Sequence, residues 1–196
     1  MNNKDLVLFL GMLCGDGHLS IHNKKRILKK STRVYQDYCT GFCNTNLKII
    51  ENFANLFYKI FNVRGNFHSR DRLNRKRIYE FVSYSKKVFD EIVALGFPIG
   101  VKRDKLRILN MIKKSSAEDK FAFLFGFFIT DGYLTKNKIR FHSGSKIFLE
   151  EISTLIYELM GERKEVKSYV QKEKYLSYQL TLNKEESRKI LQASVA

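Results

Sequence analysis

The chain has 196 residues, of which 44% are hydrophobic and 29% are charged, and it contains 1 proline and 11 glycines. This composition excludes collagen-like, proline-rich and wholly disordered chains. Lysine and arginine number 36 against 20 acidic residues, which gives a formal net charge of +16. A charge of this size favours a polyanionic partner, either nucleic acid or an anionic membrane surface.

No apolar run is long enough to cross a membrane. The two longest, Leu6–Cys14 and Phe121–Ile129, have about half of the roughly 20 residues that a spanning helix needs. The first run also lacks the small-residue cleavage site of a secretory signal peptide. Three cysteines without a disulfide framework indicate a reducing compartment. We therefore expect an intracellular protein, in the cytoplasm or nucleoid or in a eukaryotic organelle, with no membrane partner.

The chain contains one internal repeat. Phe9–Ser20 reads FLGMLCGDGHLS and Leu124–Thr135 reads LFGFFITDGYLT, so glycine, aspartate, glycine and leucine recur in register. Each copy predicts an apolar helix that stops at Asp-Gly, where glycine accepts a left-handed backbone without steric cost. The elements that follow also recur, so the sequence predicts an α+β fold built from two pseudo-symmetric αββαββα repeats.

The predicted elements follow the same order in both copies. After the first motif we expect a strand-like region at His18–Cys43, a helix from Asn46, strands at Val63–Arg70 and Arg77–Tyr84, and a helix opened by Ser85. A linking segment then contains a helix near Asp104–Lys113 and a capping signal at Ser115–Glu118. After the second motif we expect a strand at Lys138–His142, a helix from Ser145, strands at Val166–Lys172 and Tyr175–Leu182, and a helix opened by the box Asn183–Glu186.

The predicted boundaries are residues 1–95 for the first repeat, 96–117 for the linking segment and 118–196 for the second repeat. The first repeat carries about 16 additional residues between its first strand and its second helix, by the offsets of the two copies. These residues include the basic run Lys24–Arg26.

Small residues on the two motif helices predict close packing. Gly11 and Gly15 lie four positions apart, as do Gly126 and Thr130, and small residues at this spacing let helix backbones approach. Asp16 and Asp131 then meet at helix C-termini, where the helix dipole and their mutual repulsion are both unfavourable. A divalent cation relieves that repulsion, and oxygen ligands suit Mg²⁺. One Asp-Gly pair is usually a turn, but its duplication in register favours a metal site. The predicted ligand set is Asp16, Asp131, Gly15 and Thr130.

Alternation along the strands predicts one basic face and one apolar face. Apolar residues such as Phe67 and Val170 are expected to pack on helices, while the opposite side chains are those that pair with bases and phosphates. A solvated face is the alternative, yet these strands carry almost only positive charge; Arg77–Tyr84 is less clear, because Glu80 shares a face with Ile78 and Val82. The predicted DNA-binding residues are Lys24, Lys25, Arg26, Arg33, Asn44, Arg64, Asn66, His68, Arg70, Arg72, Arg75, Arg77, Lys136, Lys138, Arg140, His142, Lys167, Tyr169, Gln171, Lys172 and Gln179.

The two motifs, Phe9–Gly17 and Leu124–Gly132, resemble the LAGLIDADG homing endonucleases in their single-chain, two-repeat form. The segment Gly-Phe-Pro-Ile-Gly-Val-Lys at 96–102 is similar to one that follows the first repeat in this family, and the resemblance places Lys102 in the active site. The resemblance further implies that two antiparallel sheets form a saddle along DNA, with the motif helices between the repeats. The catalytic residues that it implies are Asp16, Asp131 and Lys102.

The resemblance also implies an activity. We expect a monomeric nuclease that cuts both strands of a long asymmetric DNA target by hydrolysis, leaving short 3′ overhangs, and that serves intron or intein homing. Mg²⁺ is the expected cofactor, with Mn²⁺ as a substitute and Ca²⁺ supporting binding without efficient cleavage. No obligate protein partner is expected.

Other classes are weighed against this one. A non-catalytic nucleic-acid binder such as an intron RNA maturase is the alternative, although such a binder has no need of both aspartates. A dimeric regulator is disfavoured, because the duplication already supplies a second half-site. Cys14, His18, Cys39 and Cys43 match no usual zinc-ligand spacing.

Overall fold

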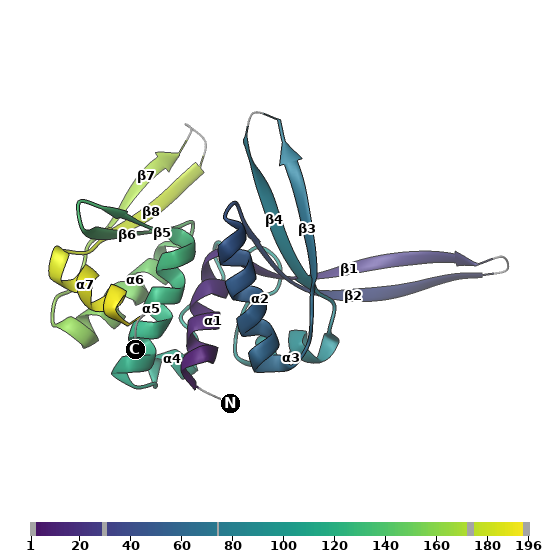
Figure 1. The fold of residues 1–196 in the computed structure, drawn as a ribbon, viewed down its shortest axis with the longest axis horizontal. Helices are drawn as coiled ribbons and strands as arrows, with labels where there is room; N and C mark the ends of the chain where they lie inside the picture. The colour runs from purple at the N-terminus through teal and green to yellow at the C-terminus, as the bar shows by residue number, and fades with distance from the viewer. Residues whose placement is uncertain (1–2, 29–30, 74, 172–174, 194–196) are drawn as a thin grey trace. The chain divides into compact units, whose positions relative to one another are not determined.

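The structure is a computed structural model that describes residues 3–28, 31–73, 75–171 and 175–193 (Figure 1). The chain divides into two compact units, one formed by Gly17–Gly100 and the other by Met1–Asp16 together with Val101–Ala196. Each unit holds one four-stranded antiparallel sheet, which confirms the predicted α+β class. The boundaries read from the sequence repeat, at residues 95 and 118, stay a prediction.

The unit Gly17–Gly100 packs two helices against its sheet. Its elements are β1 (Gly17–Leu28), β2 (Ser31–Asn44), α2 (Leu47–Phe61), β3 (Asn66–Arg72), β4 (Arg75–Ser83) and α3 (Lys86–Ala94), and the strand order is β1-β2-β4-β3. Phe42 and Phe81 lie opposite each other on β2 and β4. The ring of Phe53 on α2 stacks on Phe42, with 4.0 Å between ring centroids. Asn46 and Ser85 cap the two helices with their side chains.

The second unit repeats this arrangement. Its elements are α1 (Asn3–Asp16), α4 (Asn110–Lys113), α5 (Ala117–Asp131), β5 (Gly132–Thr135), β6 (Lys138–Ser143), α6 (Lys146–Met160), β7 (Val166–Gln171), β8 (Tyr175–Thr181) and α7 (Lys184–Gln192), with the strand order β5-β6-β8-β7. Phe127 stacks on Phe141 of β6, with ring centroids 5.3 Å apart. Asn183 and Glu186 form the predicted capping box at the start of α7. None of the described helices has the length and apolar character needed to cross a membrane.

The motif helices α1 and α5 lie side by side and parallel. Lys4 and Glu118 pair at their first turns, with 3.8 Å between Nζ and Oε1. A Cβ added to Gly11 would lie 3.1 Å from the Cα of Gly126, so the two backbones are in contact. One turn later Gly15 faces the side chain of Thr130. The predicted packing through small residues is therefore confirmed.

The glycines after the two motifs do not take the left-handed conformation expected of a helix stop. Gly132 is extended, with φ −109° and ψ 161°, and Gly17 is the first residue of β1. The chain passes directly from helix to strand at both places. Gly132 is needed for space instead, because a Cβ there would lie 2.6 Å from the ring and carbonyl of Phe128.

The helix predicted at Asp104–Lys113 is shorter than expected, because only Asn110–Lys113 forms α4. The amide of Ile108 donates to the Glu151 carboxylate of α6 at 2.6 Å, so it makes no helical hydrogen bond. The capping signal also shifts by one residue: Ser116 caps α5, while the Ser115 hydroxyl donates to the Ile112 carbonyl.

Two apolar strand residues that were expected to pack on helices are exposed. Phe67 is 54% exposed and Val170 is 63% exposed. Val170 lies in the outer part of the β7–β8 hairpin, which extends past the helices of its own unit (Figure 1). Phe67 lies near the start of β3, opposite the buried Phe81 of β4. The Phe67 ring contacts the core in an edge-to-face arrangement with Phe81, with 5.7 Å between ring centroids. Alternation therefore predicts which face a residue takes but not how far the helices cover that face.

Candidate active site and nucleic-acid interface

Two carboxylates end the parallel helices. Asp16 is the last residue of α1 and Asp131 is the last residue of α5. Both carboxylates lie at the negative ends of the helix dipoles, and neither helix has a basic residue in its last turn. Burial raises the pKa of Asp131 to about 7, and the charge of Asp16 acts in the same direction while Lys102 opposes it. The structure thus brings together two carboxylates whose joint ionisation is unfavourable without a cation.

Lys102 places its ammonium group at the C-terminal end of α1. Its Nζ donates to the carbonyl oxygens of Leu13 at 3.4 Å, Cys14 at 2.9 Å and Gly15. Burial lowers the pKa of Lys102, whereas Asp131 acts in the opposite direction. Carbonyls at a helix C-terminus lack partners within the helix, and a cation is favourable there. Lys102 therefore belongs to the aspartate site and is not a free lysine of a surface linker.

A cavity of about 390 Å³ opens beside these groups. Asp131, Lys102 and Gly15 lie on its wall together with Arg103, a residue that the sequence analysis did not single out. The Arg103 guanidinium donates to the carbonyl of Leu176 at 2.5 Å. Its aliphatic part passes Gly144, where an added Cβ would lie 3.4 Å from Cγ. The cavity thus combines two cationic side chains with a carboxylate. In the sequence, the only sign of these two cations is the adjacent pair Lys102-Arg103.

The donor atoms of this site suit a hard divalent cation. Two aspartates supply carboxylate oxygens, and the carbonyl of Gly15 already accepts from the Lys102 ammonium. The Thr130 hydroxyl donates to the carbonyls of Gly126 and Phe127 within its own helix and keeps the lone pairs of its oxygen, so both the hydroxyl and the main-chain oxygen of Thr130 remain available as ligands. Among the described residues, no three histidine, cysteine, aspartate or glutamate side chains gather into a metal site. A cation here would be completed by water or by a phosphate.

Six predicted DNA-binding positions of the second unit share one face of its sheet: Lys138, Arg140, His142, Lys167, Tyr169 and Gln179. The register places Arg140 opposite Thr181, and His142 and Lys167 both opposite Gln179. Lys138 and Lys167 are exposed, and Lys136 lies in the tight turn between β5 and β6 with φ 49°. Of the remaining predicted positions, the side chain of Gln171 and the whole of Lys172 lie outside the described residues.

Aromatic rings hold two of these side chains in place. Arg140 donates to the hydroxyl of Tyr133 at 2.9 Å, and the Tyr133 ring stacks on His142 with 5.4 Å between centroids. His142 Nδ1 lies 2.9 Å from the Tyr169 hydroxyl. Burial and the charge of Arg140 lower the pKa of His142. Sequence reasoning missed Tyr133, although alternation from Lys138 across a tight turn places it on this face.

The predicted positions of the first unit are divided between two faces. Asn66, His68 and Arg70 are exposed and lie opposite Val82, Glu80 and Ile78, so one acid stands among them. Arg77 is on the other face, where it pairs with Asp71 at 2.7 Å.

Arg64 is not on the strand where it was predicted, because β3 begins at Asn66. Its guanidinium lies 5.6 Å from the ring centroid of Tyr58 on α2. Asn44 accepts from the amide of Asn46 just before α2. Lys24 pairs with Asp37, and Lys25 is exposed. The side chains of Arg26, Arg33, Arg72 and Arg75 lie outside the described residues.

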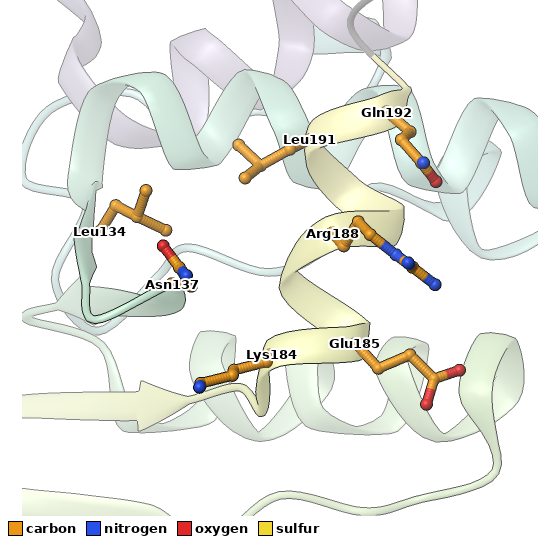
Figure 2. Close-up of a pocket in the computed structure, with 7 residues that line it drawn as sticks. All are labelled: Leu134, Asn137, Lys184, Glu185, Arg188, Leu191 and Gln192. Atoms are coloured by element: carbon orange, nitrogen blue, oxygen red, sulfur yellow. The ribbon is translucent and has the colours of Figure 1, made fainter.

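A larger cavity, of about 660 Å³, lies elsewhere in the second unit between α7 and the β5–β6 turn. Figure 2 shows Leu134 and Asn137 on one side and the α7 residues Lys184, Arg188 and Leu191 on the other. It contains none of the predicted catalytic residues, and Glu185 is its one carboxylate. The smaller cavity is therefore the candidate active site.

Two sequence comparisons identify relatives. Residues 118–193 match the model of the LAGLIDADG-like domain. The chain is also 30% identical over 158 residues to the replication factor C small subunit of Methanocaldococcus jannaschii. That match covers 81% of this chain but only 7% of the relative, so the chain spans a small part of the protein that it matches.

Solved structures share the fold over nearly the whole chain. The homing endonuclease I-DmoI in complex with DNA and Mn aligns with a TM-score of 0.66 at 18% identity, covering 97% of this chain and 96% of that one. I-DmoI has also been solved with DNA and Ca. The homing endonuclease I-WcaI bound to its DNA recognition sequence aligns with a TM-score of 0.64 at 15% identity, covering 98% of this chain and 81% of that one.

A structure not described as an endonuclease matches as well. Full-length DUF199/WhiA from Thermatoga maritima aligns with a TM-score of 0.61 at 11% identity, covering 98% of this chain and 55% of that one. Together these matches confirm the resemblance carried by the two motifs. Residues 118–193 are a LAGLIDADG-like domain, and the chain as a whole has the fold of the single-chain homing endonucleases.

Proposed function

We propose that this protein is a metal-dependent, site-specific endonuclease that cuts both strands of duplex DNA in a long asymmetric target. One observation carries the proposal: Asp16 and Asp131 end two parallel, glycine-packed helices beside the Lys102 ammonium. A protein that only binds nucleic acid gains nothing from two carboxylates that repel each other. We further propose that the protein is a monomer and that it acts on DNA inside the cell.

The residues of the candidate site divide the work of hydrolysis. A divalent cation held by Asp16 and Asp131 would supply Lewis-acid stabilisation of the phosphate. Lys102, on the wall of the same cavity, would offset charge that develops on the phosphate oxygens. Arg103 would hold the phosphate itself, because a guanidinium matches two of its oxygens. Water attacks phosphorus and gives up one proton to solvent, the bond from phosphorus to the leaving sugar oxygen breaks, and that oxygen takes up a proton from solvent.

The polar strand faces are the proposed DNA-binding surface. Lys138, Arg140, His142, Lys167 and Gln179 share one face in the second unit, and Arg140 is held by Tyr133. Arginine and glutamine read base edges, and lysine binds phosphate. Mg²⁺ is the proposed cofactor, with Mn²⁺ as a substitute and Ca²⁺ supporting binding without efficient cleavage. The capture of I-DmoI with DNA and Mn or Ca supports a divalent ion in this role.

Cleavage selection tests the proposal directly. The protein is incubated with a library of long duplexes and Mg²⁺, and the new DNA ends are mapped. We expect ends that cluster at one sequence, on both strands, with a constant short offset. Ends that are scattered, or no ends at all in Mg²⁺ and in Mn²⁺, would contradict a site-specific nuclease.

A non-catalytic nucleic-acid binder, such as an intron RNA maturase, is the second candidate. The match to DUF199/WhiA supports keeping it, because the same fold occurs in a protein that is not described as an endonuclease, and a fold does not fix a function. Binding of structured RNA without cleavage of any duplex in the selection would favour this candidate.

Replacing Lys102 by methionine is expected to slow cleavage by roughly 100-fold at saturating enzyme, because one cation near the phosphate is lost. DNA affinity should fall less than about tenfold, the loss of one phosphate contact at most. Single-turnover assays on the selected target measure both quantities. Lys105→Met, three residues later on an exposed position, is the matched control and should leave the rate unchanged. Wild-type rates for Lys102→Met would remove Lys102 from the chemistry.

DNA binding is expected to weaken steeply with salt. With about 8 phosphate contacts, the slope of log affinity against log salt concentration should be near −7, because each contact releases counterions. Fluorescence anisotropy with a labelled target in Ca²⁺ measures this slope without cleavage. A slope shallower than about −3 would mean few phosphate contacts and would contradict an extended interface.

A further inference from the structure

The segment that carries Lys102 and Arg103 to the cavity is an interrupted helix. It begins with one helical turn, in which the amide of Leu106 donates to the Lys102 carbonyl at 2.7 Å. Residues 106–109 then have no regular structure, and the chain becomes helical again only in α4. Nothing in the local sequence requires this interruption, because Asp104–Lys113 contains neither proline nor glycine.

Side chains take the place of the missing helical hydrogen bonds. In a continuous helix the amide of Ile108 would donate to the carbonyl of Asp104. The Ile108 amide donates instead to the Glu151 carboxylate, at 2.6 Å. The Asp104 carbonyl accepts from the Arg107 guanidinium at 3.1 Å, and the same guanidinium donates to the carbonyl of Leu106 at 2.7 Å. Donor and acceptors of the helix are thus occupied by other partners.

Glu151 ties the interruption to another element of the fold. Arg107 belongs to the segment itself, whereas Glu151 lies on α6. The other oxygen of the half-buried Glu151 carboxylate accepts from the Lys113 ammonium at 2.6 Å, so one side chain binds both the interruption and α4. Hydrogen bonds to a charged group are stronger than neutral ones. Loss of this carboxylate should therefore favour the continuous helix.

Winding of residues 106–109 into a helix would shorten the segment. An extended residue spans about 3.3 Å and a helical residue about 1.5 Å, so four residues would shorten by up to about 7 Å. The Lys102 ammonium donates to the Cys14 carbonyl at 2.9 Å. The Arg103 guanidinium donates to the Leu176 carbonyl at 2.5 Å. Neither contact would survive a movement of several ångströms.

We propose that Glu151 is a positioning residue of the nuclease, which keeps residues 106–109 from winding into a helix and so holds Lys102 and Arg103 in the cavity. The inference rests on the proposed function for the chemistry of these two cations. Glu151 lies outside the described wall of the cavity. It therefore acts through the segment and not on the phosphate.

Replacing Glu151 by alanine tests the inference, because alanine keeps α6 helical while it removes both bonds. We expect single-turnover cleavage at saturating enzyme to slow by about tenfold or more, the usual worth of a hydrogen bond to a charged group. Glu151→Gln keeps an oxygen for the Ile108 amide and should recover most of the rate. Glu150→Ala is the matched control, since it removes the exposed partner of Lys146 at the preceding position of α6, and it should cut at the wild-type rate.

Two further measurements separate positioning from a general loss of structure. Backbone carbon chemical shifts of residues 104–109, recorded without DNA or metal, should move toward helical values in Glu151→Ala and stay unchanged in Glu150→Ala. Proline fits at position 109, because Leu109 has φ −62° and ψ 142°, and it bars a continuous helix. In the Leu109→Pro background, Glu151→Ala should therefore slow cleavage by less than about twofold.

The outcomes separate this inference from the proposed nuclease. Unchanged chemical shifts in a folded Glu151→Ala variant would overturn it. A wild-type cleavage rate in that variant would overturn it as well, and so would equal slowing with and without Leu109→Pro. A wild-type protein that cuts nothing in the selection would contradict the nuclease, whereas helical shifts in Glu151→Ala that Leu109→Pro abolishes would still support Glu151 as the residue that holds the segment.

Discussion

Replacing Asp131 by asparagine is expected to abolish double-strand cleavage while leaving DNA affinity within about threefold of the wild-type value. Asparagine keeps the shape of aspartate but loses the charge that holds a divalent cation. Loss of that ligand should slow hydrolysis by at least about 1,000-fold, or about 4 kcal/mol. Asp16→Asn is expected to behave in the same way, because the two carboxylates stand at equivalent ends of α1 and α5. Single-turnover cleavage in Mg²⁺ and anisotropy in Ca²⁺ measure the two effects separately.

The same substitution is expected to change how stability depends on pH. Burial and Asp16 raise the pKa of Asp131 to about 7, so the folded state holds the proton more tightly than the unfolded state does. Stability from this group is complete only below the ordinary aspartate pKa of 3.8 and is lost as the pH rises from there through 7. Asp131→Asn removes that loss, so in EDTA at pH 8 its Tm should equal or exceed the wild-type Tm. At pH 5 the difference should be smaller.

Thermal unfolding at the two pH values checks this, with the exposed Asp104→Asn as a control that should shift neither Tm. Two results would contradict the assignment of Asp131. One is cleavage of both strands at the wild-type rate in the asparagine variant. The other is a Tm well below the wild-type value at pH 8, which would make the loss of activity a loss of fold.

Because of the internal repeat, much of this fold could be predicted from the sequence. A single apolar run before Asp-Gly has several interpretations, but two copies in register predicted paired helices, and Gly11 and Gly126 are in backbone contact as that pairing requires. The capping box of α7 could also be predicted, because the two residues that form it, Asn183 and Glu186, are only three positions apart in the chain. Local signals of this kind depend on neighbours in the chain and not on the rest of the fold.

Contacts between residues that are far apart in the sequence could not be predicted. The helix expected over Asp104–Lys113 is shortened to α4, because Glu151, 43 residues after Ile108, accepts from the Ile108 amide. Arg103 joins the cavity through Leu176, and no local pattern marks that contact. Lys102 was placed in the site by family resemblance alone, and its bonds to the end of α1 span 87 to 89 positions. Sequence therefore predicted the aspartate pair, while the cations around it depend on tertiary packing.

The contact between the motif helices gives a second large expected effect. Gly11→Ala should destabilise the protein, although alanine normally stabilises a helix by about 1 kcal/mol relative to glycine. The new Cβ would lie 2.9 Å from the amide nitrogen of Phe127 and 3.1 Å from the Cα of Gly126, and backbone atoms cannot rotate away. The helices would have to separate, and overpacking of this kind costs about 1–3 kcal/mol or more.

Gly15→Ala is the matched comparison, because it adds the same methyl group one turn later on the same helix. Its Cβ would meet Oγ1 of Thr130, which a change of rotamer moves away, and would lie 2.7 Å from the Thr130 Cβ, which no rotamer moves. The added methyl group thus meets one fixed atom at position 15, whereas at position 11 it meets backbone atoms of three residues. We expect the loss of unfolding free energy in urea to be larger for Gly11→Ala than for Gly15→Ala by about 1–2 kcal/mol. Gly126→Ala should resemble Gly11→Ala, because its Cβ would lie 3.1 Å from the amide of Met12. Equal losses at positions 11 and 15 would mean that the helices adjust freely, and the position of Asp16 beside Asp131 would then not be fixed by backbone contact.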